Sequence, residues 1–205
     1  MKTIAYLIRH GNINCADLVP GRMPGTHLSE DGRKQAADLV GFFDNRGLDA
    51  IYCSPLDRAV ETAAPLARHK SLQIHIDDSF NEINFGEWTG KKFSELENDF
   101  RWKQFHFFRN GTVIPSGELM VEVQSRMIGK LQDLKQRHRG QSFAIFSHND
   151  PIKSVIAFYI GISLDLFLRI TIDTGSISVL NFENGNTEVS SVNVLRKYRM
   201  YKENV

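Results

Sequence analysis

Short apolar runs alternate with amphipathic segments along the chain, and this alternation constrains the fold more than any other feature. The runs at 3–8, 50–53 and 142–147 are typical of buried strands, and the run at 73–76 predicts a weaker strand. Segments with helical spacing of apolar residues follow these runs. Strands that alternate with helices favour an α/β fold. We therefore expect a three-layer sandwich, in which a mostly parallel central sheet is flanked by helices.

Capping residues mark where the predicted helices begin and end. Ser29 is expected to cap a helix that stops at Gly47. Ser54 and Asp150 each precede a proline, which is the pattern of an N-cap followed by proline at the first helical position. Gly161 is expected to end the helix that Asp150 begins.

The second half of the chain contains one segment that breaks the alternation. Residues 118–138 predict a helix, and 176–182 with 187–194 predict a β-hairpin, because Glu-Asn-Gly-Asn between them favours a tight turn. Residues 84–118 are instead rich in Phe and Trp and fit neither pattern. They are predicted to form an inserted segment over the carboxyl ends of the strands; the alternative is that their aromatic side chains form a small satellite core.

Length and charge exclude several classes of protein. The 205 residues fit a single domain over 1–205, and 25 Lys and Arg against 24 Asp and Glu provide no excess positive charge to attract nucleic acid. The longest apolar run, 155–162, is far shorter than the roughly 20 residues that span a bilayer. Two cysteines favour a reducing compartment. We expect a cytoplasmic protein that binds neither nucleic acid nor membrane; its oligomeric state stays open, with a homodimer as one alternative.

Two histidines and two arginines lie where the predicted parallel strands end. Arg9 and His10 follow the first strand, Arg58 comes shortly after the second, and His148 follows the run at 142–147. Ligands of open α/β sheets bind at the carboxyl ends of the strands. Paired guanidinium groups and helix N-termini both suit the oxygens of a phosphoryl group. The sequence therefore predicts a phosphoryl-binding site, and its arginines argue against a metal ion between the histidines.

The sequence resembles the histidine phosphatase superfamily, which includes the cofactor-dependent phosphoglycerate mutases. The resemblance begins at Arg9-His10-Gly11 after the N-terminal strand. Further blocks of the family pattern follow in the same order at 28–36, 52–63, 81–90, 115–118 and 147–148.

The resemblance implies a role for each site residue. His10 would be the nucleophile that becomes phosphorylated, and Arg9, Arg58 and His148 would bind the phosphoryl oxygens. Glu82 would donate a proton to the leaving group and then accept one from the attacking water. The attack requires a neutral imidazole, which the neighbouring cations favour. The implied reaction needs neither a metal nor another cofactor.

The sequence departs from the family pattern beside the two histidines. Asn12 and Ile13 replace the usual Glu or Gln and Ser or Thr, and Asn149 replaces the usual glycine. Ala16 occupies the position of an asparagine that commonly contacts phosphate in the family. Asn14 is predicted to bind the substrate in its place.

The block at 85–92 resembles the phosphatases of the family more than its mutases. We therefore expect a phosphomonoester hydrolase that acts through a phosphohistidine on a small phosphorylated metabolite. One alternative is a mutase-type phosphotransferase, which returns the phosphoryl group to bound substrate. The other is a non-catalytic protein that binds a phosphorylated ligand. Aromatic and basic residues within 100–109 could hold the leaving group or pack against the sheet.

Overall fold

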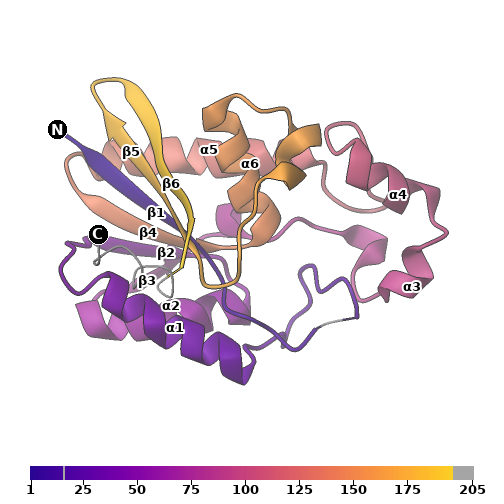
Figure 1. Ribbon diagram of the computed structural model, residues 1–205, viewed down its shortest axis with the longest axis horizontal. Helices are drawn as coiled ribbons and strands as arrows, with labels where there is room; N and C mark the ends of the chain where they lie inside the picture. Colours follow the sequence, from indigo (N-terminus) through magenta and orange to yellow (C-terminus); the bar gives the residue numbers. More distant parts are fainter. Residues whose placement is uncertain (16, 196–205) are drawn as a thin grey trace, which may run out of the picture.

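A six-stranded sheet forms the centre of the computed structural model, which describes residues 1–15 and 17–195 (Figure 1). The strands are β1 (Thr3–Arg9), β2 (Ala50–Cys53), β3 (Ile74–Ile76), β4 (Ser142–Ser147), β5 (Ile177–Glu183) and β6 (Asn186–Val194). Their order across the sheet is β3-β2-β4-β1-β5-β6. The first four of these strands pair in parallel, whereas β5 is antiparallel to both β1 and β6. The predicted, mostly parallel sheet is confirmed.

Helices cover both faces of this sheet. The longer helices are α1 (Glu30–Phe42), α2 (Asp57–Lys70), α5 (Met120–Arg137) and α6 (Asn149–Ile160). Single turns and short helices are η1 (Asp78–Phe80), η2 (Gly86–Trp88), α3 (Phe93–Leu96), α4 (Phe100–Phe107) and η3 (Leu164–Arg169). The α1 and α2 helices pack together on one face, and α5 packs on α6 on the other (Figure 1). The three-layer prediction is therefore confirmed. Within the described ranges, no helix is both long and apolar enough to cross a membrane.

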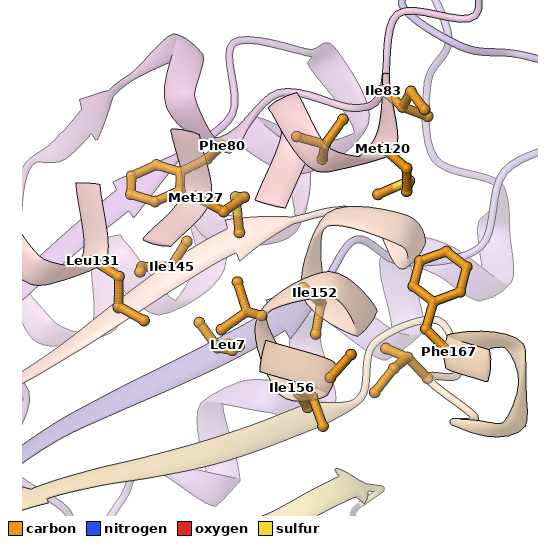
Figure 2. Packing of buried hydrophobic residues seen from close by; sticks show 14 of the residues in the cluster. Leu7, Phe80, Ile83, Met120, Met127, Leu131, Ile145, Ile152, Ile156 and Phe167 are labelled. Carbon is orange, nitrogen blue, oxygen red and sulfur yellow. The ribbon is translucent and has the colours of Figure 1, made fainter. Parts of the chain in front are cut away.

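Alternating side chains of the strands form a separate core on each face of the sheet. In β1, Tyr6 and Ile8 pack with α1 and α2, whereas Leu7 points to the opposite face. Figure 2 shows Leu7 close to Met127 of α5 and Ile156 of α6. Full burial of each such side chain contributes about 1.5–3 kcal/mol. Both cores hold the strands rigidly, so the carboxyl ends of the strands have fixed positions.

Some predicted helix ends are confirmed and others are wrong. The Ser29 hydroxyl accepts a hydrogen bond from the Gly32 amide at the start of α1, and Gly161 ends α6 with a left-handed backbone (φ 73°). The α1 helix does not continue to Gly47 but ends at Phe42. The chain leaves the helix at the next residue, Phe43, whose ring is fully buried in the core between the helix and the sheet.

The predicted caps at Ser54 and Asp150 are also wrong. The α2 helix begins only at Asp57, and α6 begins two residues earlier than predicted, with His148 at its N-cap position. Both predicted caps have other partners: the Ser54 hydroxyl is 2.7 Å from a ring nitrogen of His148, and the Asp150 carboxylate pairs with Arg109. Both side chains therefore take part in contacts around the site and do not cap helices.

The inserted segment, 84–118, carries α3 and α4 beyond the carboxyl ends of the strands (Figure 1). Its aromatic side chains have two different environments. Trp88 and Phe105 are 1% exposed and belong to the core, whereas Phe100 and Phe107 on α4 are 75% and 81% exposed. Part of the segment therefore packs into the core, and part of it extends over the carboxyl ends of the strands. Each of the two predictions describes one of these parts.

Candidate active site

Four of the predicted site residues come from the ends of three neighbouring parallel strands. Arg9 ends β1 and His10 follows it, Arg58 lies in the first turn of α2 after β2, and His148 follows β4. Because β2, β4 and β1 are adjacent in the sheet, these side chains meet at one edge. The ring centres of His10 and His148 are 5.1 Å apart. The structure therefore places the predicted residues in one site.

A contact with the backbone determines which nitrogen of the His10 ring carries the proton. Its Nδ1 lies 2.7 Å from the carbonyl oxygen of Gly11. A carbonyl oxygen only accepts, so Nδ1 carries the proton and Nε2 retains a lone pair. Burial, followed by the charge of Arg58, lowers the pKa of His10 to about 3. His10 is therefore a neutral imidazole at pH 7, with Nε2 in the form that a nucleophile requires.

Both arginines of the site have N–H groups without partners. The Arg58 side chain is buried and donates from Nη2 to the Gly21 carbonyl at 2.7 Å, but its Nε and Nη1 contact no acceptor among the described residues. Arg9 donates from Nη1 to the Ile172 carbonyl, and its Nε is likewise unpaired within that part of the chain. Buried cationic donors of this kind are costly unless an anion accepts from them. The unpaired N–H groups of two arginines at the same sheet edge as His10 therefore suit the oxygens of a phosphoryl group.

His148 is fully buried, and within the described part of the chain one of its ring nitrogens, Nε2, is hydrogen-bonded. Its Nε2 is 2.7 Å from Ser54 Oγ, which also accepts from the Leu56 amide. Among the described residues, the Ser54 hydroxyl hydrogen has no acceptor other than Nε2, so the proton of the neutral ring is on Nδ1. Burial, with smaller effects from Arg58 and His10, lowers the pKa of His148 well below 6.5. His148 thus offers a neutral N–H donor at Nδ1, which lies 3.9 Å from Glu82 Oε2.

Glu82 lies next to these groups with its carboxyl group nearly buried. One carboxyl oxygen, Oε1, accepts a hydrogen bond from the Ile83 amide at 3.0 Å. Burial and then the negative charge of Asp150 raise the pKa of Glu82 to about 7, against the opposing effect of Arg58. A carboxyl group with this pKa can both donate and accept a proton near neutral pH.

A network that the sequence analysis missed holds the backbone of Glu82 in place. Its carbonyl oxygen accepts from Arg22 Nε at 2.7 Å and from Arg126 Nη2 at 3.2 Å. The Glu118 carboxylate binds both arginines, at 2.9 Å and 2.8 Å. Glu118 lies in one of the family blocks, but Arg22 and Arg126 carry no local signal because they come from distant parts of the chain. The network fixes Glu82 relative to the sheet edge.

Replacing Glu118 by glutamine is expected to lower kcat for alkyl phosphates about 10²-fold, because displacement of a reacting group by about 1 Å has effects of that size. Loss of the charge frees both arginines to move, and the Glu82 backbone moves with them. Steady-state phosphate release measures the effect. The matched control is Glu87→Gln, which changes an exposed carboxylate in the same segment and should leave kcat unchanged. Equal kcat values for the two variants would contradict a positioning role for Glu118.

The asparagines near the histidines differ in what they contact. Asn12 accepts from the Ser29 hydroxyl at 2.8 Å, and Asn149 begins α6. Asn14 is exposed and makes no side-chain hydrogen bond within the described ranges, so its role in binding substrate stays a prediction. Ala16 lies outside the described residues. Across residues 1–15 and 17–195, no group of three or more His, Cys, Asp or Glu side chains is arranged to hold a metal ion.

Acidification is expected to destabilise the folded protein through His10. Its pKa is about 3 in the folded state and ordinarily 6.5, so the unfolded chain takes up the proton first as the pH falls. Stability is therefore lost from pH 6.5 downwards. Between pH 7 and pH 5, urea denaturation should show a loss of about 2 kcal/mol more in the unmodified protein than in His10→Gln. Equal losses in the two proteins would contradict the neutral, buried imidazole.

The fold and the site together define an α/β protein with a histidine-containing anion site at the carboxyl edge of its sheet. The chain belongs to the histidine phosphatase superfamily (branch 1), whose sequence model matches residues 5–195. The family predicted from the motifs is thus confirmed, and the chain is a phosphatase of the hydrolase class.

Named relatives are similar over most of their length. Phosphoserine phosphatase 1 of Hydrogenobacter thermophilus is 31% identical over 172 residues, which cover 82% of this chain and 80% of that protein. The crystal structure of the alpha-ribazole phosphatase from Shigella flexneri has a TM-score of 0.83 at 26% identity and covers 93% of this chain and 96% of its own. A mutant phosphoserine phosphatase from Entamoeba histolytica, in complex with phosphoserine, gives 0.83 at 27% identity, with the same coverage of 93% and 96%.

Proposed function

We propose that the protein hydrolyses phosphomonoesters of small metabolites through a phosphohistidine formed on His10. One observation carries this proposal: the neutral His10 ring keeps an unprotonated nitrogen at the same edge of the sheet as buried arginine N–H groups that have no acceptor among the described residues. A phosphoryl dianion would accept from those groups and bring its phosphorus atom within reach of the nitrogen. The relatives support the same reaction class, since those named are phosphatases of small phosphorylated compounds.

The first step transfers the phosphoryl group to the enzyme. The lone pair of His10 Nε2 forms a bond to phosphorus while the bond from phosphorus to the ester oxygen breaks. Protonated Glu82 gives its proton to that oxygen, so the alcohol leaves as a neutral molecule. Arg9 and Arg58 stabilise the charge on the equatorial oxygens, and the Nδ1–H of His148 donates to the same group.

The second step returns the enzyme to its starting state. Water attacks the phosphorus atom of the phosphohistidine, and the bond from phosphorus to Nε2 breaks. The Glu82 carboxylate accepts a proton from the water as it attacks, which restores the acid for the next cycle. Inorganic phosphate leaves, and His10 is neutral again.

Trapping of the intermediate tests this proposal. A phosphomonoester labelled with ³²P is mixed with the enzyme and quenched in alkali after a few milliseconds. We expect radioactivity on the protein that survives alkali and is lost in acid, since an N–P bond has this stability. Rapid turnover without any labelled protein would contradict a covalent intermediate.

The fate of the phosphoryl group separates hydrolysis from the mutase alternative. With 2- or 3-phosphoglycerate as the substrate, phosphate release should exceed isomerisation, because water and not a second alcohol accepts the group. Both products can be measured in one reaction by ³¹P NMR. Isomerisation faster than release would favour the mutase, and binding without either reaction would favour the non-catalytic alternative.

A further inference from the structure

Gly11 lies directly after the proposed nucleophile, and its carbonyl oxygen is the acceptor that keeps the proton of His10 on Nδ1. The orientation of this carbonyl group therefore decides whether Nε2 is free to attack phosphorus. A glycine has no side chain through which the protein can hold it, so neighbouring groups must hold its backbone. Two side chains from different helices do this, and the proposed reaction gives neither of them a role.

Thr62, on α2, holds Gly11 from the amino side. The Gly11 amide donates to Thr62 Oγ1 at 2.9 Å, and the Thr62 hydroxyl donates in turn to the Arg58 carbonyl at 2.6 Å. Thr62 is fully buried, so water does not compete for either hydrogen bond. One hydroxyl group thus joins the segment that carries His10 to the helical turn that carries Arg58, the arginine proposed to bind the phosphoryl group.

Gln35, on α1, holds the following peptide group. The Gly11 carbonyl and the Asn12 amide belong to this one planar group. The Asn12 amide donates to Gln35 Oε1 at 2.7 Å, while the carbonyl faces the His10 ring. Gln35 Nε2 donates to Thr174 Oγ1 at 3.1 Å, which keeps the side-chain oxygen directed toward Asn12. Because the peptide group is rigid, the contact with its N–H also orients its carbonyl oxygen.

The α1 helix also packs directly against Gly11. A Cβ atom on Gly11 would lie 2.6 Å from the Gly32 carbonyl oxygen, and one on Gly32 would clash with the Asn12 carbonyl oxygen. Side chains do not approach a backbone this closely, so the two segments pack together because both residues are glycine. This packing restricts where Gly11 lies, whereas the two hydrogen bonds determine how its peptide groups are oriented.

We infer that Thr62 and Gln35 are positioning residues for the phosphoryl transfer: they hold Gly11 from both sides, and Gly11 holds His10 with Nε2 free for the attack. This inference rests on the proposed function, because it assigns the support of the nucleophile in that reaction. Both side chains act through the backbone and not on the substrate. Their loss should therefore change the state of the His10 ring as well as the rate.

Replacement of Thr62 by valine tests the inference, because it removes the hydroxyl and keeps the shape of the side chain. The Gly11 amide then lacks its acceptor, so kcat for an alkyl phosphate should fall about 10²-fold, the effect of moving a reacting group by about 1 Å. Long-range ¹H–¹⁵N NMR spectra at pH 7 should show a mixture of His10 tautomers in place of one. The His10 signals are identified by their absence from His10→Gln. Thr62→Ser, which keeps the hydroxyl, should retain most of the rate and the single tautomer.

The matched control is Thr112→Val. It removes another buried threonine hydroxyl that donates to a carbonyl oxygen four residues earlier, at Phe108 in the inserted segment. This variant should leave kcat and the His10 spectrum unchanged. Gln35→Leu tests the second contact and should also lower kcat and mix the tautomers. Gln35 is only half-buried, so this variant is expected to fold even if Thr62→Val does not.

The opposing outcomes separate the positioning role from a structural one. An unchanged kcat in either variant, or a lower stability to urea with an unchanged His10 spectrum, would overturn the inference while leaving the proposed function intact. Absence of turnover in the unmodified enzyme, on alkyl phosphates and p-nitrophenyl phosphate alike, would overturn the proposed function, and the positioning role with it.

Discussion

Replacement of His10 by alanine is expected to lower kcat about 10⁵-fold or more, since loss of a nucleophile removes the covalent route entirely. The buried ring has no substitute: His148, the nearest histidine, has its Nε2 engaged by Ser54 and carries its proton on Nδ1. The labelled phosphoenzyme should disappear together with turnover. Phosphate release and alkaline-quench labelling measure the two effects on the same preparation.

The control for His10→Ala is His69→Ala, which removes a histidine of α2 that lies near Asp44 at the surface. This variant should keep full turnover and labelling. Arg9 and Arg58 remain in place in His10→Ala, so that protein should still bind inorganic phosphate, as shown by calorimetry. Residual activity within tenfold of the unmodified enzyme would show that another group attacks phosphorus.

Replacement of Glu82 by glutamine is expected to affect substrates according to their leaving groups. Alkoxide ions are poor leaving groups without a proton, so kcat for an alkyl phosphate should fall about 10³-fold, within the usual range for general acid catalysis. The p-nitrophenolate ion leaves readily without a proton, so hydrolysis of p-nitrophenyl phosphate should fall far less. A glutamine side chain has nearly the same shape, which makes the variant a test of the proton and not of packing.

The pH profile provides a second measure of Glu82. Its pKa is raised to about 7, so the acid form is lost as the pH rises through that value. The kcat/KM for an alkyl phosphate should therefore decrease above pH 7 in the unmodified enzyme, and Glu82→Gln should lack this decrease. Glu183→Gln, which changes an exposed residue at the end of β5, should retain the full profile. Equal losses on alkyl and aryl substrates would exclude Glu82 as the proton donor.

The sheet and the residues at its edge could be predicted because their signals are local. Buried strands are short apolar runs, and the residue after each run lies at the carboxyl edge in any parallel sheet. That reasoning was sufficient to place His10, Arg58 and His148 together. Glu82 was different: it does not follow a recognisable strand, and only the resemblance to a family pointed to it.

Helix caps were predicted less well, and for a physical reason. A serine or aspartate before a proline has a strong local tendency to cap a helix. Ser54 and Asp150 do not cap because tertiary partners, His148 and Arg109, compete for the same side-chain atoms. Such partners lie about 94 and 41 residues away along the chain, so no local pattern contains them.

The order of amino acids by itself determined the layers, the strand ends and the position of His10 at one of those ends, since periodicity and adjacency along the chain encode these. Only the tertiary structure decided the protonation of His10 and the support of Glu82 by Arg22 and Arg126. These properties depend on burial and on charges brought together from distant segments. Burial and the approach of distant charges both occur only when the folded chain excludes water from the sheet edge. A local sequence pattern therefore cannot predict their effects.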